Sequence, residues 1–194
     1  MRASVALLLL MLAGCAGNQP SPEQERTSFD ACRNGVPEDP DASLRFADSR
    51  YELAWQRRCD NGGTRVFRQA SGSDSAEARL VTLTRYPPDA GVEATLDAYL
   101  ARSASERVGE PQIFQRGSGG SERYIAELML RREDAGHLEY ILHGVTRGRG
   151  DRVISVTYTH RFDADGDAGL ERIKADQATW VGAIERHLAA FPPP

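Results

Sequence analysis

The sequence lacks the features that point directly to a membrane-spanning, nucleic-acid-binding or metal-binding protein. Its longest apolar run, residues 5–12, is too short to cross a bilayer, which takes about 20 residues. The net charge of −4 is a poor match for a nucleic-acid partner. The 3 cysteines and 4 histidines show no zinc-like spacing, and no catalytic motif is present. We therefore expect neither an enzyme nor a bound metal or cofactor.

The N-terminus is typical of an export signal. Arg2 precedes the apolar run, and small residues follow it. Leu12-Ala13-Gly14-Cys15 resembles the lipobox of bacterial lipoproteins. The resemblance implies that residues 1–14 are a signal peptide and that Cys15 is lipidated after cleavage. An ordinary secretory signal with a chance cysteine is the alternative.

The residue after Cys15 is Ala16 and not aspartate. By resemblance to lipoproteins of Gram-negative bacteria, this implies sorting to the outer membrane. The residue does not specify the leaflet, and we expect the domain to face the periplasm. Residues 15–28 hold the lipidated cysteine and a polar stretch with two prolines, which predicts a disordered tether. Residues 29–194 are then of the right length for a single domain.

Two cysteines remain in that domain, Cys32 and Cys59. Export would place them in an oxidising compartment, so we expect a disulfide between them. Two buried free thiols are the alternative.

Hydrophobic periodicity predicts the secondary structure of the domain. Alternation and runs of β-forming residues predict seven strands, and apolar residues at helical spacing predict two helices. Residues 29–48 are ambiguous, because Phe29 and Cys32 could share a helix face but Pro37 and Pro40 break the pattern. We expect an α+β domain with an antiparallel sheet of about six strands, a short middle helix and a long C-terminal amphipathic helix, both helices on one face. The expected strands are 50–58, 64–69, 79–86, 112–115, 123–131, 138–147 and 153–162, and the expected helices are 92–104 and 168–190.

This order of elements resembles the PsbP-like α/β/α architecture, which is used by photosystem accessory proteins and by several small bacterial lipoproteins. The resemblance covers about residues 50–191 and includes Trp180 in the last helix. It implies a non-enzymatic binding or accessory module of the cell envelope, for a protein or a small hydrophobic ligand. The alternative is a periplasmic immunity or inhibitor lipoprotein that neutralises a toxin or hydrolase.

Weaker candidates have ordinary structural explanations. The acidic run 163–167 fails the EF-hand pattern, and the glycine-rich segment 117–121 is not a nucleophile elbow. The Arg-Gly-Asp tripeptide at 149–151 fits a hairpin turn. His160 lies on the apolar face of its strand, which predicts a hydrogen-bonded core histidine, and the role of His143 is left open.

Overall fold

The structure is a computed structural model that describes residues 32–35, 42–59, 61–69, 78–117, 122–133, 136–163 and 167–190. Two compact units divide the chain, Met1–Ala31 and Cys32–Pro194. The expected signal peptide, Cys15 and the tether up to residue 28 lie outside the described residues. All elements below, and the whole of the described core, belong to the second unit.

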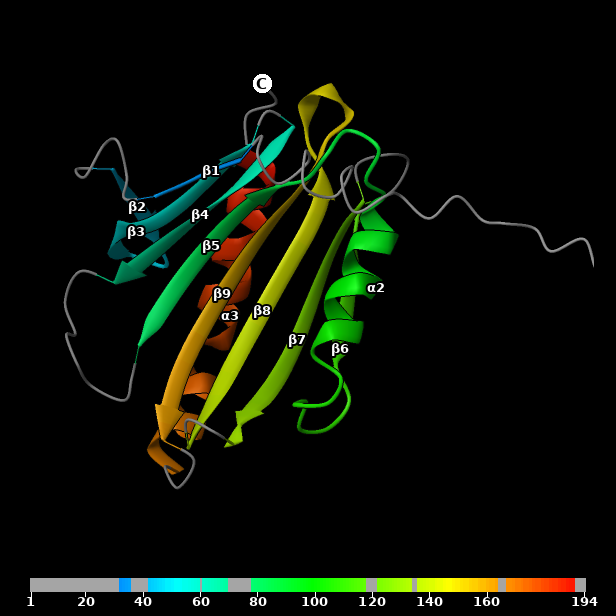
Figure 1. Cartoon of the computed structure of the whole chain (residues 1–194). Coiled ribbons are helices and arrows are strands. Elements are labelled where there is room, and N and C mark those ends of the chain that lie inside the picture. Colours follow the sequence, from blue (N-terminus) through cyan, green and yellow to red (C-terminus); the bar gives the residue numbers. More distant parts are fainter. Residues whose placement is uncertain are drawn as a thin grey trace, which may run out of the picture. The chain divides into compact units, whose positions relative to one another are not determined.

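The described residues of that unit contain one antiparallel sheet of nine strands, in the order β1-β3-β4-β5-β9-β8-β7-β6, with β2 pairing separately with β3 (Figure 1). All seven expected strands are present, and two short strands precede them, so the sheet has nine strands where about six were predicted. The strands are β1 Cys32–Gly35, β2 Ser43–Phe46, β3 Ser49–Cys59, β4 Gly62–Gln69, β5 Arg79–Arg85, β6 Gln112–Arg116, β7 Arg123–Arg132, β8 His137–Arg147 and β9 Val153–Asp163.

The two extra strands come from the ambiguous N-terminal part of the domain. Of the possibilities left open there, the structure has strands and not a helix at Cys32, because β1 and β2 pair with the two ends of β3. Ala47 and Asp48, both with positive φ, make the tight turn between β2 and β3. Strands of four residues are too short to show a clear period, which is why the sequence pattern missed them.

The two helices, α2 Val92–Arg102 and α3 Asp167–Ala190, lie on opposite faces of the sheet (Figure 1). Their expected placement on one face is therefore wrong. Strand β8 is buried on both sides: Tyr140 packs in the α3 cluster, whereas Ile141 and Val145 pack in the cluster that contains Leu96 of α2. Because successive side chains of a strand point to opposite faces, one apolar strand serves both helices.

The α3 side holds the larger part of the core. Trp180 lies against Tyr158 and Tyr140, with ring centroids 4.9 and 5.7 Å apart. Gly144 of β8 allows the helix to approach closely, since a Cβ there would lie 2.4 Å from Cγ2 of Ile184. This contact fixes the position of α3 across the sheet.

A bulge in β3 changes which face Trp55 occupies. The alternation predicted that Tyr51, Leu53 and Trp55 share one face. The pairing with β4 shifts between Leu53 and Trp55, so Trp55 points away from the α3 core and is 40% exposed. One extra residue in a bulge reverses the face of everything that follows it.

Candidate functional site

A groove lies on the α2 side of the sheet, where α2 covers β8 but leaves β5 and β9 open. Its volume is about 1120 Å³. The α2 helix and the segment 103–108 that follows it form one wall, and the sheet forms the floor. The floor carries five hydroxyl side chains, Thr82, Thr84, Ser155, Thr157 and Thr159.

This polar floor follows from strand alternation. The strand β5 directs Val81 into the α3 core and therefore directs Thr82 to the opposite face. In the register of β5 with β9, Thr82 pairs with Thr157 and Thr84 pairs with Ser155, so the hydroxyl groups form adjacent rows. The matched alternation of threonines in the two strands was the sequence signal for this surface, and it could not be recognised before the pairing was known.

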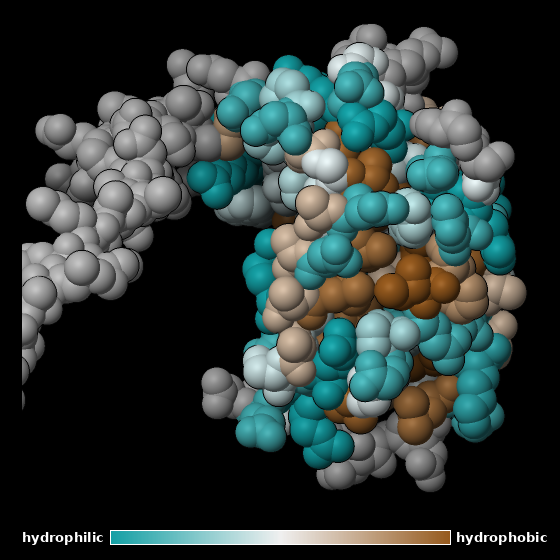
Figure 2. All heavy atoms as spheres, turned by 90° about the vertical axis from the view of Figure 1, so that its right-hand side faces the viewer, coloured by the Kyte–Doolittle hydropathy of each residue, from teal (hydrophilic) through white to brown (hydrophobic). Residues whose placement is uncertain are grey.

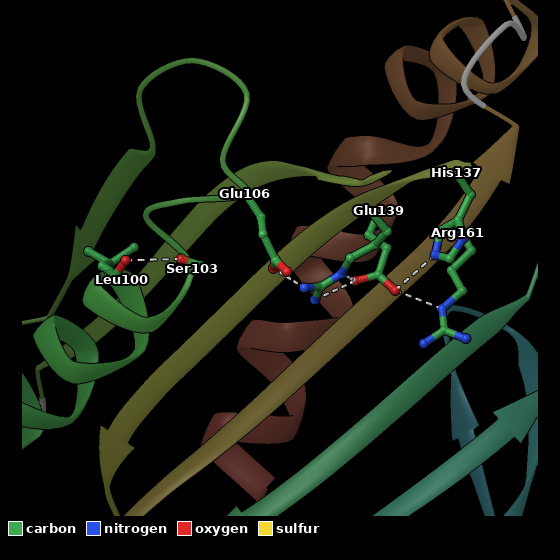
Figure 3. Close-up of polar contacts among 7 residues, drawn as sticks. Leu100, Ser103, Glu106, His137, Glu139 and Arg161 are labelled. Carbon is green, nitrogen blue, oxygen red and sulfur yellow. Dashed lines mark hydrogen bonds and ion pairs between the residues drawn. The ribbon is translucent and has the colours of Figure 1, made fainter. Parts of the chain in front are cut away.

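A network of charges stands beside the hydroxyl rows (Figure 3). The carboxylate of Glu139 is 4% exposed and accepts hydrogen bonds from Nε of Arg132 at 2.9 Å and from Nε of Arg161 at 2.7 Å. Burial alone raises the pKa of Glu139, but the hydrogen bonds and charges of the two arginines outweigh it and hold that pKa below its usual value. Glu139 is thus ionised at neutral pH.

The same network fixes the wall of the groove. Arg132 also pairs with Glu106, which lies in the segment after α2. Two backbone hydrogen bonds, from Arg131 N to Glu106 O and from Val108 N to Met129 O, both 2.8 Å, attach this segment to β7. The wall is therefore held by both main-chain and side-chain contacts.

Arg161 is held by Glu139 at one nitrogen only. Its side chain is 40% exposed, and Figure 3 shows the end of its guanidinium group pointing away from Glu139. Because a guanidinium group has five N–H donors, the terminal nitrogens of Arg161 keep donors beyond the bond to Glu139. Such a pre-oriented arginine is suited to a polar or anionic ligand.

His143 lies under Tyr99 of α2 at the edge of the groove. Its Nδ1 is 2.8 Å from Oγ1 of Thr157, and its Nε2 is buried with no hydrogen-bond partner in the described part of the chain. Burial, followed by the charge of Arg102, lowers the pKa of His143 to about 3. His143 is therefore an uncharged hydrogen-bonding group at neutral pH.

The other sequence candidates lie outside this groove or have structural roles. His160 is fully buried, with its ring against those of Phe162 and Trp180, which confirms the predicted core position, whereas the hydrogen bond expected for it stays a prediction. Residues 149–151 form a 3-10 turn between β8 and β9 in which Gly150 has a φ of 71°. Most of the acidic run 163–167 and of the segment 117–121 lies outside the described residues.

Cys59 is disulfide-bonded, and its residue partner in the register of β1 with β3 is Cys32. This register agrees with the disulfide expected between them. Cys15 lies outside the described residues. Across the described ranges, no group of three or more histidine, cysteine or acidic side chains is placed to hold a metal ion. No helix within those ranges has both the length and the apolar character needed to cross a membrane.

No protein-family model matches this chain, and no curated protein matches it. A solved structure that resembles it is a protein of unknown function, PA94 from Pseudomonas aeruginosa, described as a putative regulator. The two chains are 17% identical with a TM-score of 0.45, and the match covers 79% of this chain and 97% of the other. A likeness at this level says nothing about the function of the chain.

Proposed function

We propose that this chain is a lipid-anchored, non-enzymatic binding module of the bacterial cell envelope, which holds a small polar ligand in the groove beside α2. The observation that carries the proposal is the groove itself, with rows of hydroxyl groups on its floor and a wall fixed by the Glu139 network. Its volume of about 1120 Å³ is sufficient for a small ligand.

The lining favours a polar ligand over a hydrophobic one. Threonine and serine hydroxyl groups donate and accept hydrogen bonds, and an apolar ligand would remove them from water without replacing those bonds. Arg161 adds donors at one end of the hydroxyl rows. Sugars, amino acids and small carboxylic acids have the matching groups.

Thermal shifts with these three classes of compound test the proposal. We expect at least one compound to raise the melting temperature of the protein, and the shift to fall when Thr82 and Thr157 are both changed to valine. Valine has the shape of threonine but no hydroxyl group, so it removes hydrogen bonds and keeps the volume. Thr179→Val on the exposed side of α3 is the matched control. A shift that survives the double valine variant would place the ligand elsewhere.

The location at the membrane has its own test. Lipidation of Cys15 would attach the chain to the outer membrane, with the domain in the periplasm. Cys15→Ser removes the acceptor sulfur, so the variant should leave the lipid-anchored fraction and should not be labelled by a radioactive fatty acid. Labelling of the variant at the level of the natural chain would mean that Cys15 is not the lipidated residue.

A second candidate function is protein antagonism, as in an immunity or inhibitor lipoprotein. It is favoured by the edge of the sheet at β6, where Ile113 is 50% exposed and Val108 is 46% exposed. Figure 2 views the molecule from this side and shows hydrophobic residues gathered on it. A photo-reactive residue at position 113 should then cross-link to one stoichiometric protein in intact envelopes, whereas a groove-binding module predicts no such product.

A further inference from the structure

A second, smaller cavity lies at the end of the sheet where β3 turns into β4. Its volume is about 340 Å³. Among the described residues that line it there is no aspartate or glutamate, although the whole chain has a net charge of −4. Five of the lining residues are arginines, Arg57, Arg58, Arg65, Arg85 and Arg152. We call this cavity the arginine cleft.

Strand register explains why the arginines gather there. Gly63 of β4 pairs with Arg58 of β3 on one side and with Arg85 of β5 on the other. The three residues therefore form one row across the sheet, and Arg65 lies two residues further along β4 on the same face. Three guanidinium-bearing side chains thus stand around a glycine.

Gly63 provides a floor without a side chain. A Cβ at this position would lie 2.7 Å from the carbonyl oxygen of Arg57, so the backbones are too close for any other residue. A ligand between Arg58 and Arg85 would meet main chain and not a side chain. Small anions in proteins are commonly bound where exposed backbone and arginine side chains converge.

Two of the five arginines are the best placed to contact a ligand. Arg57 and Arg58 take part in interactions of their own, and Arg152 donates to the carbonyl oxygen of Asn61 at 3.2 Å. Arg65 and Arg85, in contrast, are exposed at the mouth of the cleft. Positive charges held together in this way repel one another, and a bound anion removes that repulsion.

We propose that the arginine cleft is a binding site for phosphate groups. The planar guanidinium group matches a phosphate with two parallel hydrogen bonds, and the volume suits one or two phosphates better than a large ligand. The phosphate belongs either to a soluble compound or to a lipid headgroup, which have this chemistry in common. The site is separate from the groove beside α2, because only Thr84 lines both cavities.

The first experiment titrates pyrophosphate into the mature chain by calorimetry at low salt. The mature chain is residues 15–194 with Cys15→Ser, which removes the acyl group. We expect binding that weakens about tenfold or more in the variant Arg65→Gln/Arg85→Gln, as the loss of hydrogen bonds to a charged group implies. The control Arg50→Gln/Arg68→Gln removes the same charge from exposed positions of β3 and β4 outside the cleft and should bind as the natural chain does.

The second arm distinguishes the two sources of phosphate. Vesicles of phosphatidylcholine, with and without phosphatidylglycerol, are mixed with the same three proteins and sedimented. Sedimentation that requires phosphatidylglycerol and is lost only in the Arg65/Arg85 variant assigns the site to lipid headgroups. Pyrophosphate binding with no sedimentation assigns it to soluble phosphates.

The proposal is overturned if neither probe binds, or if the variant and the control lose binding equally, since the effect would then be one of net charge alone. Equal melting temperatures of the three proteins show that the exposed substitutions leave the fold intact. The Thr82/Thr157 valine variant of the groove should still bind pyrophosphate. The experiments can therefore contradict the phosphate site in the arginine cleft and the ligand site in the groove independently of each other.

Discussion

Tyr99 of α2 lies flat on His143 of β8, with ring centroids 3.7 Å apart and ring planes inclined by 1°. Burial raises the pKa of Tyr99 to about 12 and lowers that of His143 to about 3. Both rings are therefore uncharged across the whole neutral range. This neutral pair fixes α2 on the sheet beside the groove, so the shape of the groove depends on His143 remaining unprotonated.

The first prediction concerns pH and follows from His143. Its pKa is about 3 in the folded chain against an ordinary value of 6.5, so between these values the unfolded chain binds more protons. Stability is then fully present above pH 6.5 and is lost as the pH falls. The titration of His143 lowers the free energy of unfolding by roughly 1.4 kcal/mol for each pH unit below about 6.

Urea denaturation between pH 5 and 6.5 measures this slope. In that interval Glu139 contributes little, because its pKa lies below the ordinary carboxyl value. Burial also lowers the pKa of His187, which adds to the slope of the natural chain. His143→Asn keeps a side-chain partner for Thr157 and should reduce the slope, while an unchanged slope would mean that His143 titrates normally.

The second prediction concerns Glu139, the carboxylate shared by Arg132 and Arg161. Glu139→Gln leaves Arg161 without its carboxylate partner and leaves Arg132 with Glu106 alone, and the side chains of these two arginines are 40% and 33% exposed. Breaking a fully buried pair costs about 3–5 kcal/mol, and partial exposure of the arginines reduces this to about 2–3 kcal/mol. The free energy of unfolding at pH 7 gives the value directly.

Glu171→Gln is the matched control for that substitution. Glu171 pairs with Lys174 on α3, and both side chains are more than 70% exposed, at 71% and 72%. Such a surface pair contributes little, so we expect a change of less than about 0.5 kcal/mol. Similar losses in the two variants would contradict the view that burial makes the Glu139 network important.

The periodicity of apolar residues predicts most of the strands and helices of this chain. Strand β9 alternates cleanly because one face packs on α3 and the other lines the groove, and α3 has an apolar stripe because only one side of it is buried. In each case every face of the element has a single kind of environment, so the periodicity of its own residues predicts the element.

The features that the sequence did not predict depend on how pairs of elements pack or pair with each other. To predict that α2 and α3 lie on opposite faces, one has to know that both faces of β8 are buried. The polar residues Glu139 and His143 made one of these faces resemble a solvent-exposed one. The exposure of Trp55 depends on a bulge defined by the partner strand. The Glu139 network likewise joins β7, β8, β9 and the segment after α2, which are distant in sequence.

The third prediction contrasts two glycines. Gly144→Ala places a Cβ 2.4 Å from Cγ2 of Ile184 and 2.9 Å from Cδ1 of Leu188, both in the core, so α3 or these side chains must shift. Overpacking of this kind costs about 1–3 kcal/mol. Gly182→Ala lies in α3, where the nearest atom to an added Cβ is 3.5 Å away, and should stabilise the chain by roughly 0.5–1 kcal/mol. Opposite shifts in melting temperature confirm the contrast, and a stabilising Gly144→Ala would contradict the close approach of α3.

The fourth prediction concerns the disulfide expected between Cys32 of β1 and Cys59 of β3. Cys59 is disulfide-bonded and is paired in register with Cys32, so a Cys32–Cys59 peptide should be found by mass mapping without reduction. The bond closes a loop of about 28 residues, which corresponds to roughly 3–4 kcal/mol on the chain-entropy model. Replacing both cysteines by serine should lower the free energy of unfolding by about that amount.

The position of this disulfide also links it to the arginine cleft, which Cys59 lines. If the bond holds β1 on the end of β3, the double serine variant should release β1 and speed amide hydrogen exchange first in β1 and in the adjoining end of β3. Exchange in α3 and in the middle of β8 should remain slow, because their contacts lie in the core. Two freely alkylatable thiols in the natural chain, or uniform exchange across the sheet in the variant, would contradict this local role.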